Sequence, residues 1–293
     1  MVARCCLLLS LFLLAAPGSA QRAGSGDLVL SNGPGAYGVA KIKQSGGIRN
    51  GPEYGSATIY YPTDAKPPYA SIVIVPGFRS FKAKLKDWGP YLASHGIVTM
   101  LIGTNNIFQN PPGRGEALLD AVVSLKAEHS RVSSPLNGRL DTSRVAVGGW
   151  SMGGGGAQLA AASDSSIRAV VALCPYLFRK KLSPSDLDHG VPLLIFAGEK
   201  DFTAPTASQA SVHYELTPAE TDKLIYEVKG RGHRAGNHPA NANGDVGRVA
   251  LAWLKKYLVG EVQYCAPLLA APPSASEYET NLECDREVPI TGR

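Results

Sequence analysis

The chain has 293 residues, 44% of them hydrophobic, and its 29 basic and 24 acidic residues give a formal net charge of +5. This length is enough for one domain with a large hydrophobic core. The mild positive charge does not gather into a basic stripe, which argues against a nucleic-acid-binding protein. No apolar segment after residue 20 is long enough to cross a bilayer, so stable membrane insertion is not expected.

The first twenty residues have the pattern of a secretory signal peptide. A basic start precedes an apolar run at 7–16 that is too short to span a bilayer, and small residues at 18–20 form a cleavage site. A retained anchor is the alternative. We expect a signal peptide at 1–20, secretion of the mature chain, and a flexible Gly/Ser-rich segment at 21–35.

Apolar strands and amphipathic helices alternate along the rest of the chain. The run 71–75 is continuously apolar, as a buried parallel strand should be, and 116–128 carries an apolar stripe with helical spacing. The predicted strands are 37–43, 56–61, 71–75, 97–102, 144–148, 167–173, 193–197 and 224–228. The predicted helices are 87–95, 116–128, 153–162, 204–216 and 246–258. This alternation predicts an α/β fold with a mainly parallel twisted sheet and helices on both faces.

The strand at 144–148 runs into Gly149-Trp150-Ser151-Met152-Gly153, followed by an Ala-rich helical segment. The G-x-S-x-G pattern between a strand and a helix is typical of the nucleophile elbow of α/β-hydrolases. Glycines allow the strand and helix to pack closely, and the tight turn presents the serine hydroxyl above the sheet. A flexible glycine turn is the alternative interpretation.

Three residues follow predicted strands in the order Ser151, Asp201, His233. In an open parallel sheet the active site lies beyond the carboxyl ends of the strands, and this is the chain order of the triad in α/β-hydrolases. A serine hydroxyl needs a base within hydrogen-bond reach to become a good nucleophile. We expect His233 to be that base and Asp201 to orient its imidazole.

Alternatives exist for both partners of the serine. Asp201 could instead cap the helix predicted from residue 204, and Glu199 is a rival acid nearer the strand end. His233 could be an ordinary surface-loop residue, with His238 as the rival base. The remaining histidines are predicted to be structural or exposed: His95, His129, His189 and His213.

Acyl transfer also needs hydrogen-bond donors for the oxyanion. The backbone N–H of Met152, directly after the serine, is the first expected donor. The Phe78 N–H, in the Pro76-Gly77-Phe78 segment after an early strand, is the second, unless that segment is only a strand-ending turn.

Cys265 and Cys284 are the natural disulfide pair in an oxidising compartment, because they bracket a Pro/Ala/Ser-rich tail with little core of its own. Cys174 ends an apolar run and is expected to be a buried free thiol. No Cys/His spacing indicates zinc, so no metal or cofactor is expected. The predicted organisation is a catalytic domain at 36–262 and a tail at 263–293 pinned by the disulfide.

Several of these motifs together resemble the bacterial cutinase and polyester (PET) hydrolase family of serine α/β-hydrolases, within the dienelactone-hydrolase-like superfamily. The resemblance covers roughly residues 30–285, and its most specific part is the extended elbow Gly-Trp-Ser-Met-Gly-Gly-Gly-Gly at 149–156. It rests also on the segments 74–78, 88–96, 195–205 and 232–233.

The resemblance implies a triad of Ser151, Asp201 and His233 and an oxyanion hole of Phe78 and Met152. It implies that Phe78, Trp150 and Tyr176 line the acyl cleft. The family usually has Trp where Tyr176 stands, which puts the turnover of aromatic polyesters in doubt. Where some members have a second disulfide this chain has Gly198 and Ala235, whereas the Cys265–Cys284 pair matches the family.

Only about 19 residues separate the predicted strands 167–173 and 193–197, too few for a large lid. An open site suits bulky or polymeric esters. We therefore expect a secreted, monomeric serine carboxylic ester hydrolase of cutinase type that acts through an acyl-serine intermediate. A small-ester or lipid esterase on the same scaffold is the first alternative, and a non-catalytic binding protein with this fold is the second.

Overall fold

The computed structural model describes residues 32–177 and 183–284. The predicted signal peptide, most of the segment at 21–35 and the last nine residues lie outside the described residues. In the part that is described, no helix is long and apolar enough to cross a membrane.

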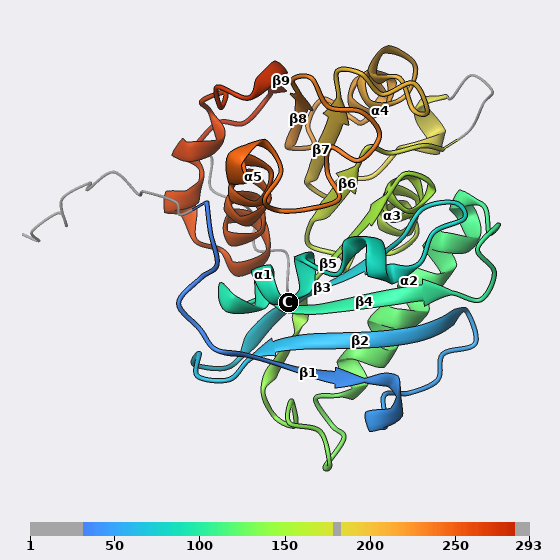
Figure 1. The fold of residues 1–293 in the computed structure, drawn as a ribbon, viewed down its shortest axis with the longest axis vertical. Coiled ribbons are helices and arrows are strands. Elements are labelled where there is room, and N and C mark those ends of the chain that lie inside the picture. Colours follow the sequence, from blue (N-terminus) through green and yellow to red (C-terminus); the bar gives the residue numbers. More distant parts are fainter. Residues whose placement is uncertain (1–31, 178–182, 285–293) are drawn as a thin grey trace, which may run out of the picture.

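The described residues form a sheet of nine strands with five α-helices (Figure 1). In chain order the elements are β1 (Val39–Lys43), β2 (Tyr54–Pro62), β3 (Tyr69–Val75), α1 (Trp88–Ser94), β4 (Val98–Thr104), α2 (Pro111–Ala127), β5 (Leu140–Trp150), α3 (Met152–Ser163), β6 (Val170–Leu173), β7 (Leu193–Gly198), α4 (Ala210–Leu216), β8 (Lys223–Val228), α5 (Asp245–Leu254) and β9 (Ala275–Thr280).

The strand order is β1-β2-β4-β3-β5-β6-β7-β8-β9. The strands from β4 to β8 in this order are mutually parallel, whereas β1, β2 and β9 join the two edges in antiparallel pairings. The mainly parallel sheet is as predicted. Because β5, β7 and β8 are parallel, the loops after them lie together at the carboxyl ends of the strands.

Side chains of the central strands alternate between two cores. In β3, Val73 and Val75 pack into a core shared with α2 and α3, whereas Ile72 and Ile74 pack into a core shared with α1 and α5. All seven residues of β3 are buried, because helices cover both faces of the sheet (Figure 1). This explains the continuous apolar runs, and it confirms the predicted helices on both faces.

The largest differences from the predicted helix bounds occur at the starts of two helices. The helix predicted at 116–128 begins earlier, at Pro111, because Asn110 caps it by accepting the Gly113 N–H at 3.0 Å, and proline is favoured in a first turn. The helix predicted at 204–216 is wrong over its first half. Only Ala210–Leu216 is α-helical, after a separate 3₁₀ turn at Thr206–Ser208.

The segment after residue 260 is more than a pinned tail, because it includes β9. This strand pairs antiparallel with β8 at the sheet edge. Its sequence, Ala-Ser-Glu-Tyr-Glu-Thr, is too polar to stand out as a strand, and only its backbone pairing with β8 defines it. The prediction therefore missed an edge strand that protects the otherwise open side of β8.

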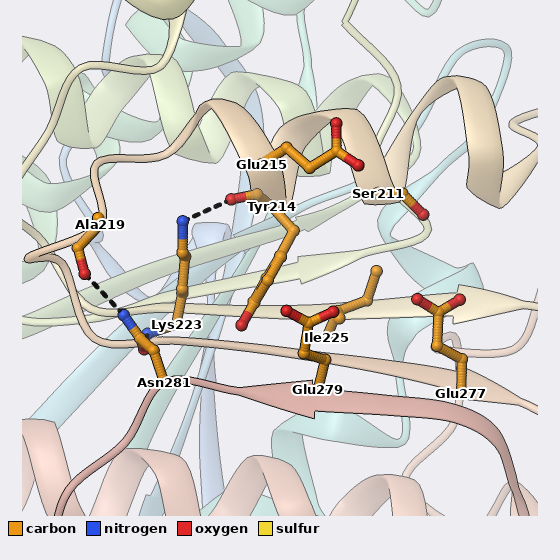
Figure 2. A pocket seen from close by; sticks show the side chains of 9 residues that line it. All are labelled: Ser211, Tyr214, Glu215, Ala219, Lys223, Ile225, Glu277, Glu279 and Asn281. Atoms are coloured by element: carbon orange, nitrogen blue, oxygen red, sulfur yellow. Dashed lines mark hydrogen bonds between the residues drawn. The ribbon is translucent and has the colours of Figure 1, made fainter.

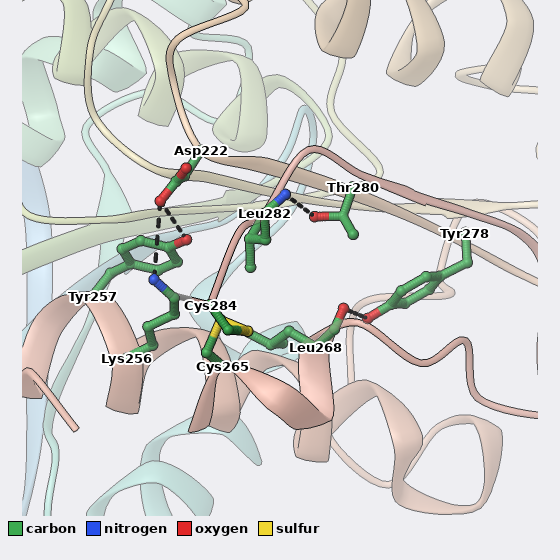
Figure 3. Close-up of a disulfide and its surroundings, with 9 residues drawn as sticks. All are labelled: Asp222, Lys256, Tyr257, Cys265, Leu268, Tyr278, Thr280, Leu282 and Cys284. Carbon is green, nitrogen blue, oxygen red and sulfur yellow. Dashed lines mark hydrogen bonds and ion pairs between the residues drawn. A yellow bond between two sulfur atoms is a disulfide. The ribbon is translucent and has the colours of Figure 1, made fainter. Parts of the chain in front are cut away.

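The predicted disulfide links Cys265 and Cys284 (Figure 3). Cys174 is a buried free thiol, as predicted. The bond closes a loop around β9, and the Tyr278 hydroxyl donates to the Leu268 carbonyl at 2.9 Å within that loop. Closing a loop of this length contributes about 3 kcal/mol in the chain-entropy description. The disulfide thus helps to hold β9, which buries little of its own side-chain surface, against β8.

Candidate active site

Ser151 lies between the last residue of β5 and the first residue of α3, in a backbone conformation that non-glycine residues rarely adopt (φ 57°, ψ −123°). Its N–H donates to the Leu173 carbonyl at 2.9 Å, and its own carbonyl accepts from Gly154, Gly155 and Tyr176. Four backbone hydrogen bonds therefore hold the strained turn in place. This is the geometry of a nucleophile elbow, not of a flexible glycine loop.

The glycines around the serine are required by close packing. A Cβ on Gly149 would lie 2.3 Å from the Gly153 carbonyl oxygen, and a Cβ on Gly153 would lie 2.5 Å from the Val75 oxygen. Neither position has room for a side chain. The G-x-S-x-G spacing thus reflects how tightly β5, α3 and the end of β3 meet.

The three predicted side chains form one hydrogen-bonded chain. His233 Nε2 lies 2.8 Å from Ser151 Oγ, and His233 Nδ1 lies 2.7 Å from Asp201 Oδ2. The Asp201 carboxylate is 0% exposed and the His233 side chain 16% exposed, so solvent reaches the histidine but hardly the acid. Low exposure strengthens these charge-assisted contacts.

The Asp201 carboxylate contacts both His233 and the backbone of the turn that follows it. Its Oδ2 faces His233, while its Oδ1 accepts the N–H groups of Thr203 and Ala204 at 2.9 and 2.8 Å. It therefore caps a local turn, not α4, which begins at residue 210. The two backbone bonds fix the orientation of the carboxylate toward the histidine.

The rival acid and base are engaged elsewhere. Glu199 Oε2 accepts the Gly230 N–H at 2.5 Å, and His238 Nδ1 lies 2.5 Å from Asp87 Oδ2. Neither contacts Ser151 in the described structure. The other histidines bond remote groups: His95 the Gly33 carbonyl, His129 the Leu140 N–H, His189 the Val191 carbonyl and His213 the Gln158 amide.

His213 gives the fold a pH dependence. The side chain is fully buried, and burial lowers the pKa of His213 from its ordinary 6.5 to about 3. Below pH 6.5 the unfolded chain takes up a proton that the folded protein does not. The stabilisation by neutral His213 is therefore complete above that pH and is lost as the pH falls toward 3. Between pH 7 and pH 5 we expect this residue alone to lower the free energy of unfolding by about 2 kcal/mol.

Urea unfolding of the wild type and of His213→Gln at pH 7 and pH 5 measures this loss of unfolding free energy. The variant is less stable at pH 7, but its stability should fall less between pH 7 and pH 5 than that of the wild type. An equal fall in the two proteins would contradict the assignment to His213.

The two predicted oxyanion donors belong to segments that adjoin the serine. Met152 is the first residue of α3, so its N–H is among those without an acceptor inside the helix. A Cβ on Gly77 would lie 2.7 Å from Ser151 Cβ, which places the loop that carries Phe78 directly against the serine.

Arg114 holds this loop and was not predicted. Its Nη1 donates to the Pro76 carbonyl at 2.7 Å and its Nη2 to the Ile107 carbonyl at 3.1 Å. The side chain is fully buried, and burial lowers the pKa of Arg114 to about 10, so it stays charged at neutral pH. Arg114 precedes the apolar stripe of its helix, and no residue pattern indicates this contact.

Aromatic residues lie in the segments next to the serine and the histidine. Phe78 is 43% exposed and packs edge-to-face against Phe108, which is 57% exposed and was not predicted. The Trp150 ring lies 5.2 Å from the His233 ring, and the half-buried Tyr176 donates its N–H to the Ser151 carbonyl. The three residues expected to line the cleft therefore all lie close to the serine or histidine.

The loop that follows β8 and carries His233, here called the histidine loop (residues 229–241), is held by three side chains. Four consecutive carbonyls, those of residues 233–236, each accept a side-chain N–H group. The Trp150 indole donates to the first at 2.6 Å, the Asn241 amide to the second and third at 2.9 and 2.8 Å, and the Trp88 indole to the fourth at 3.0 Å. Sequence reasoning missed Trp88 and Asn241, since such contacts leave no pattern.

The close approach of the histidine loop to β7 depends on Gly198. A Cβ there would lie 2.5 Å from the Gly232 carbonyl oxygen. No side chain, cysteine included, fits at this position without a shift of the loop backbone. In this chain, hydrogen bonds and close backbone packing therefore fix the position of His233.

A separate hollow of about 470 Å³ lies between α4 and the strands β8 and β9 (Figure 2). It is lined by acidic and polar side chains, including Glu215, Glu277 and Glu279, and by none of the predicted site residues. Across the residues that the structure describes, no cluster of three or more His, Cys, Asp or Glu side chains has an arrangement that could hold a metal ion.

The parallel sheet, with the elbow after β5, defines the chain as an α/β-hydrolase. More narrowly, it belongs to the PETase family, described as PET hydrolase-like, which matches residues 25–286. This membership confirms the predicted class, a carboxylic ester hydrolase of the cutinase and polyester hydrolase type.

Individual relatives agree with the family. The chain is 33% identical to a bis(hydroxyethyl) terephthalate hydrolase from Streptomyces coelicolor over 84% of this chain and 76% of the relative. It is 32% identical to Cutinase 1 from Thermobifida cellulosilytica, over 84% of this chain and 89% of the relative, and to a cutinase from Thermobifida fusca, over 84% and 77%.

Proposed function

We propose that this chain is a secreted serine hydrolase of cutinase or polyesterase type that cleaves bulky or polymeric esters through an acyl-Ser151 intermediate, without a cofactor. The observation that carries the proposal is the unbroken hydrogen-bonded chain from Ser151 Oγ through His233 to Asp201. That arrangement activates a serine hydroxyl, which on its own is a weak nucleophile.

In the first half-reaction, Ser151 Oγ attacks the ester carbonyl carbon while His233 Nε2 takes the hydroxyl proton. The Asp201 carboxylate stabilises the imidazolium that forms. The carbonyl oxygen becomes an oxyanion, which the N–H groups of Met152 and Phe78 stabilise. When the tetrahedral intermediate collapses, the C–O bond to the alcohol breaks, and His233 gives its proton to the leaving alkoxide.

In the second half-reaction, water attacks the acyl-serine and His233 takes a proton from it. A second tetrahedral intermediate forms in the same oxyanion hole. Its collapse releases the carboxylic acid, and the proton returns to Ser151 Oγ. The two half-reactions together consume one ester bond and one water molecule, with no other co-substrate.

The rim of the site supports a bulky, apolar substrate. Phe78 and Phe108 are both substantially exposed although they are large and apolar. Exposed apolar side chains gathered beside a reactive serine suit an apolar polymer surface or a bulky acyl group. We assign Trp150 and Tyr176, which contact His233 and the Ser151 backbone, to the border of the acyl site.

The remaining parts of the proposal follow from the sequence. The pattern of residues 1–20 supports export by a signal peptide, and the oxidised Cys265–Cys284 pair fits an extracellular compartment. We assign catalysis to residues 36–262 of a monomer, with the segment 263–293 as the disulfide-linked extension.

The experiment compares wild type and Ser151→Ala on 4-nitrophenyl esters of increasing acyl length and on a polyester film. The proposal predicts hydrolysis of the soluble esters and release of acid products from the film, both lost in the variant. Activity on short esters without film turnover would favour the simple-esterase alternative. Ester hydrolysis at the same rate in both proteins would refute the serine mechanism, and no hydrolysis in either would favour a binding protein.

A further inference from the structure

A surface hollow of about 510 Å³ lies beside His233 and is formed almost wholly by the histidine loop. The proposed catalytic base, His233, is part of its wall, so the hollow adjoins the residue that bonds Ser151. The hollow is lined by Arg231, Gly232, His233, Arg234, Ala235, His238 and Asn241.

The hollow carries positive charge that the protein does not neutralise. Arg231 and Arg234 are exposed, and no acidic residue occurs from 229 to 244. In the described ranges, neither guanidinium forms an ion pair with a carboxylate.

The three carboxylates that contact the histidine loop already have partners other than Arg231 and Arg234. Glu199 accepts the Gly230 N–H, Asp87 pairs with His238, and Asp201 faces His233. Two guanidinium groups beside the proposed base are thus free to bind an anion from solution.

The backbone that carries the two arginines is well fixed. The Arg234 carbonyl accepts from the Asn241 amide, and the neighbouring carbonyls accept from Trp150 and Trp88. The Arg231 carbonyl accepts the Lys200 N–H at 2.7 Å. Only the two side chains must be ordered when an anion binds, which lowers the entropic cost of binding.

We propose that Arg231 and Arg234 form an anion subsite that favours esters with a free carboxylate at the far end of the acid part, that is, monoesters of dicarboxylic acids. A planar guanidinium fork matches the two oxygens of a carboxylate. With the ester carbonyl at Ser151, the distal carboxylate of such a substrate lies in the hollow beside His233. The inference rests on the proposed ester hydrolase function and adds its substrate class.

The test uses mono(4-nitrophenyl) suberate and its methyl ester, methyl 4-nitrophenyl suberate, in which one methyl group neutralises the distal carboxylate. The measured quantity is the ratio of kcat/KM for the acid to that for the methyl ester, at low salt. In Arg231→Gln/Arg234→Gln we expect this ratio to fall about five- to tenfold, chiefly through KM, and about twofold to fivefold in each single variant. In 0.5 M NaCl the difference from wild type should shrink.

The matched control is Arg144→Gln/Arg168→Gln, which removes two charges near the amino ends of β5 and β6, at the opposite edge of the sheet. This control should leave the ratio unchanged. An unchanged ratio in the histidine-loop variant, or an equal fall in the control, would overturn the subsite. Failure of the proposed function is distinguishable, because the methyl ester would then be hydrolysed equally by wild type and Ser151→Ala.

Discussion

Ser151→Ala is expected to lower kcat for a 4-nitrophenyl ester by about 10⁵- to 10⁶-fold, to the residual rate that binding and the oxyanion donors alone sustain. The loss is this large because no other hydroxyl lies against His233 Nε2 in the described structure. Steady-state kinetics measures the effect, and circular dichroism checks that the fold is intact.

Ser163→Ala is the matched control, since Ser163 ends the same helix and its hydroxyl donates to the Leu159 carbonyl, away from the triad. It should retain the wild-type rate. The double variant Ser151→Ala/His233→Ala should be no slower than Ser151→Ala, because the two residues act as one unit. A Ser151→Ala enzyme that keeps a tenth of the activity would show that another residue attacks the ester.

Asp201→Asn is expected to lower kcat by about 10⁴-fold with little loss of stability. The asparagine keeps an oxygen for the N–H groups of Thr203 and Ala204, so the turn remains capped. Its NH₂ group, however, faces His233 Nδ1 and favours the tautomer whose Nε2 carries the proton. That histidine cannot accept a proton from Ser151.

Comparison with two further variants separates orientation from capping. Asp201→Ala should show a similar loss of kcat and an additional loss of about 1–2 kcal/mol in the free energy of unfolding, because the turn loses its cap. Glu199→Gln, two residues away, should retain activity. A larger effect of Glu199→Gln than of Asp201→Asn on kcat would make Glu199 the orienting acid.

The central part of the fold was predictable because its physical signals are local. Continuous apolar runs such as 71–75 mark strands buried on both faces, and the glycines at 149 and 153 mark a turn with no space for side chains. β9 was missed since its polar side chains resemble a loop, and only pairing with β8 defines it. The first half of the helix predicted at 204–216 failed because Pro205 and the Asp201 cap form a separate turn.

Some residues of the candidate site were also predictable from local signals, whereas others were not. Ser151, Asp201 and His233 were found from their chain order after parallel strands, and the structure brings all three within hydrogen-bond distance. Arg114 and Trp88 were missed because they donate to backbone carbonyls of other segments. Such contacts depend on the folded path of the chain, not on a residue pattern.

The most direct test of the central claim is covalent labelling with a 4-nitrophenyl phosphonate ester, followed by intact-mass measurement and peptide mapping. An activated serine predicts first-order loss of activity with one phosphonyl group per molecule, located on Ser151. In His233→Ala, the labelling rate should fall by several orders of magnitude. A phosphonyl group on another residue when activity is lost, or unchanged labelling of Ser151 in His233→Ala, would contradict the account.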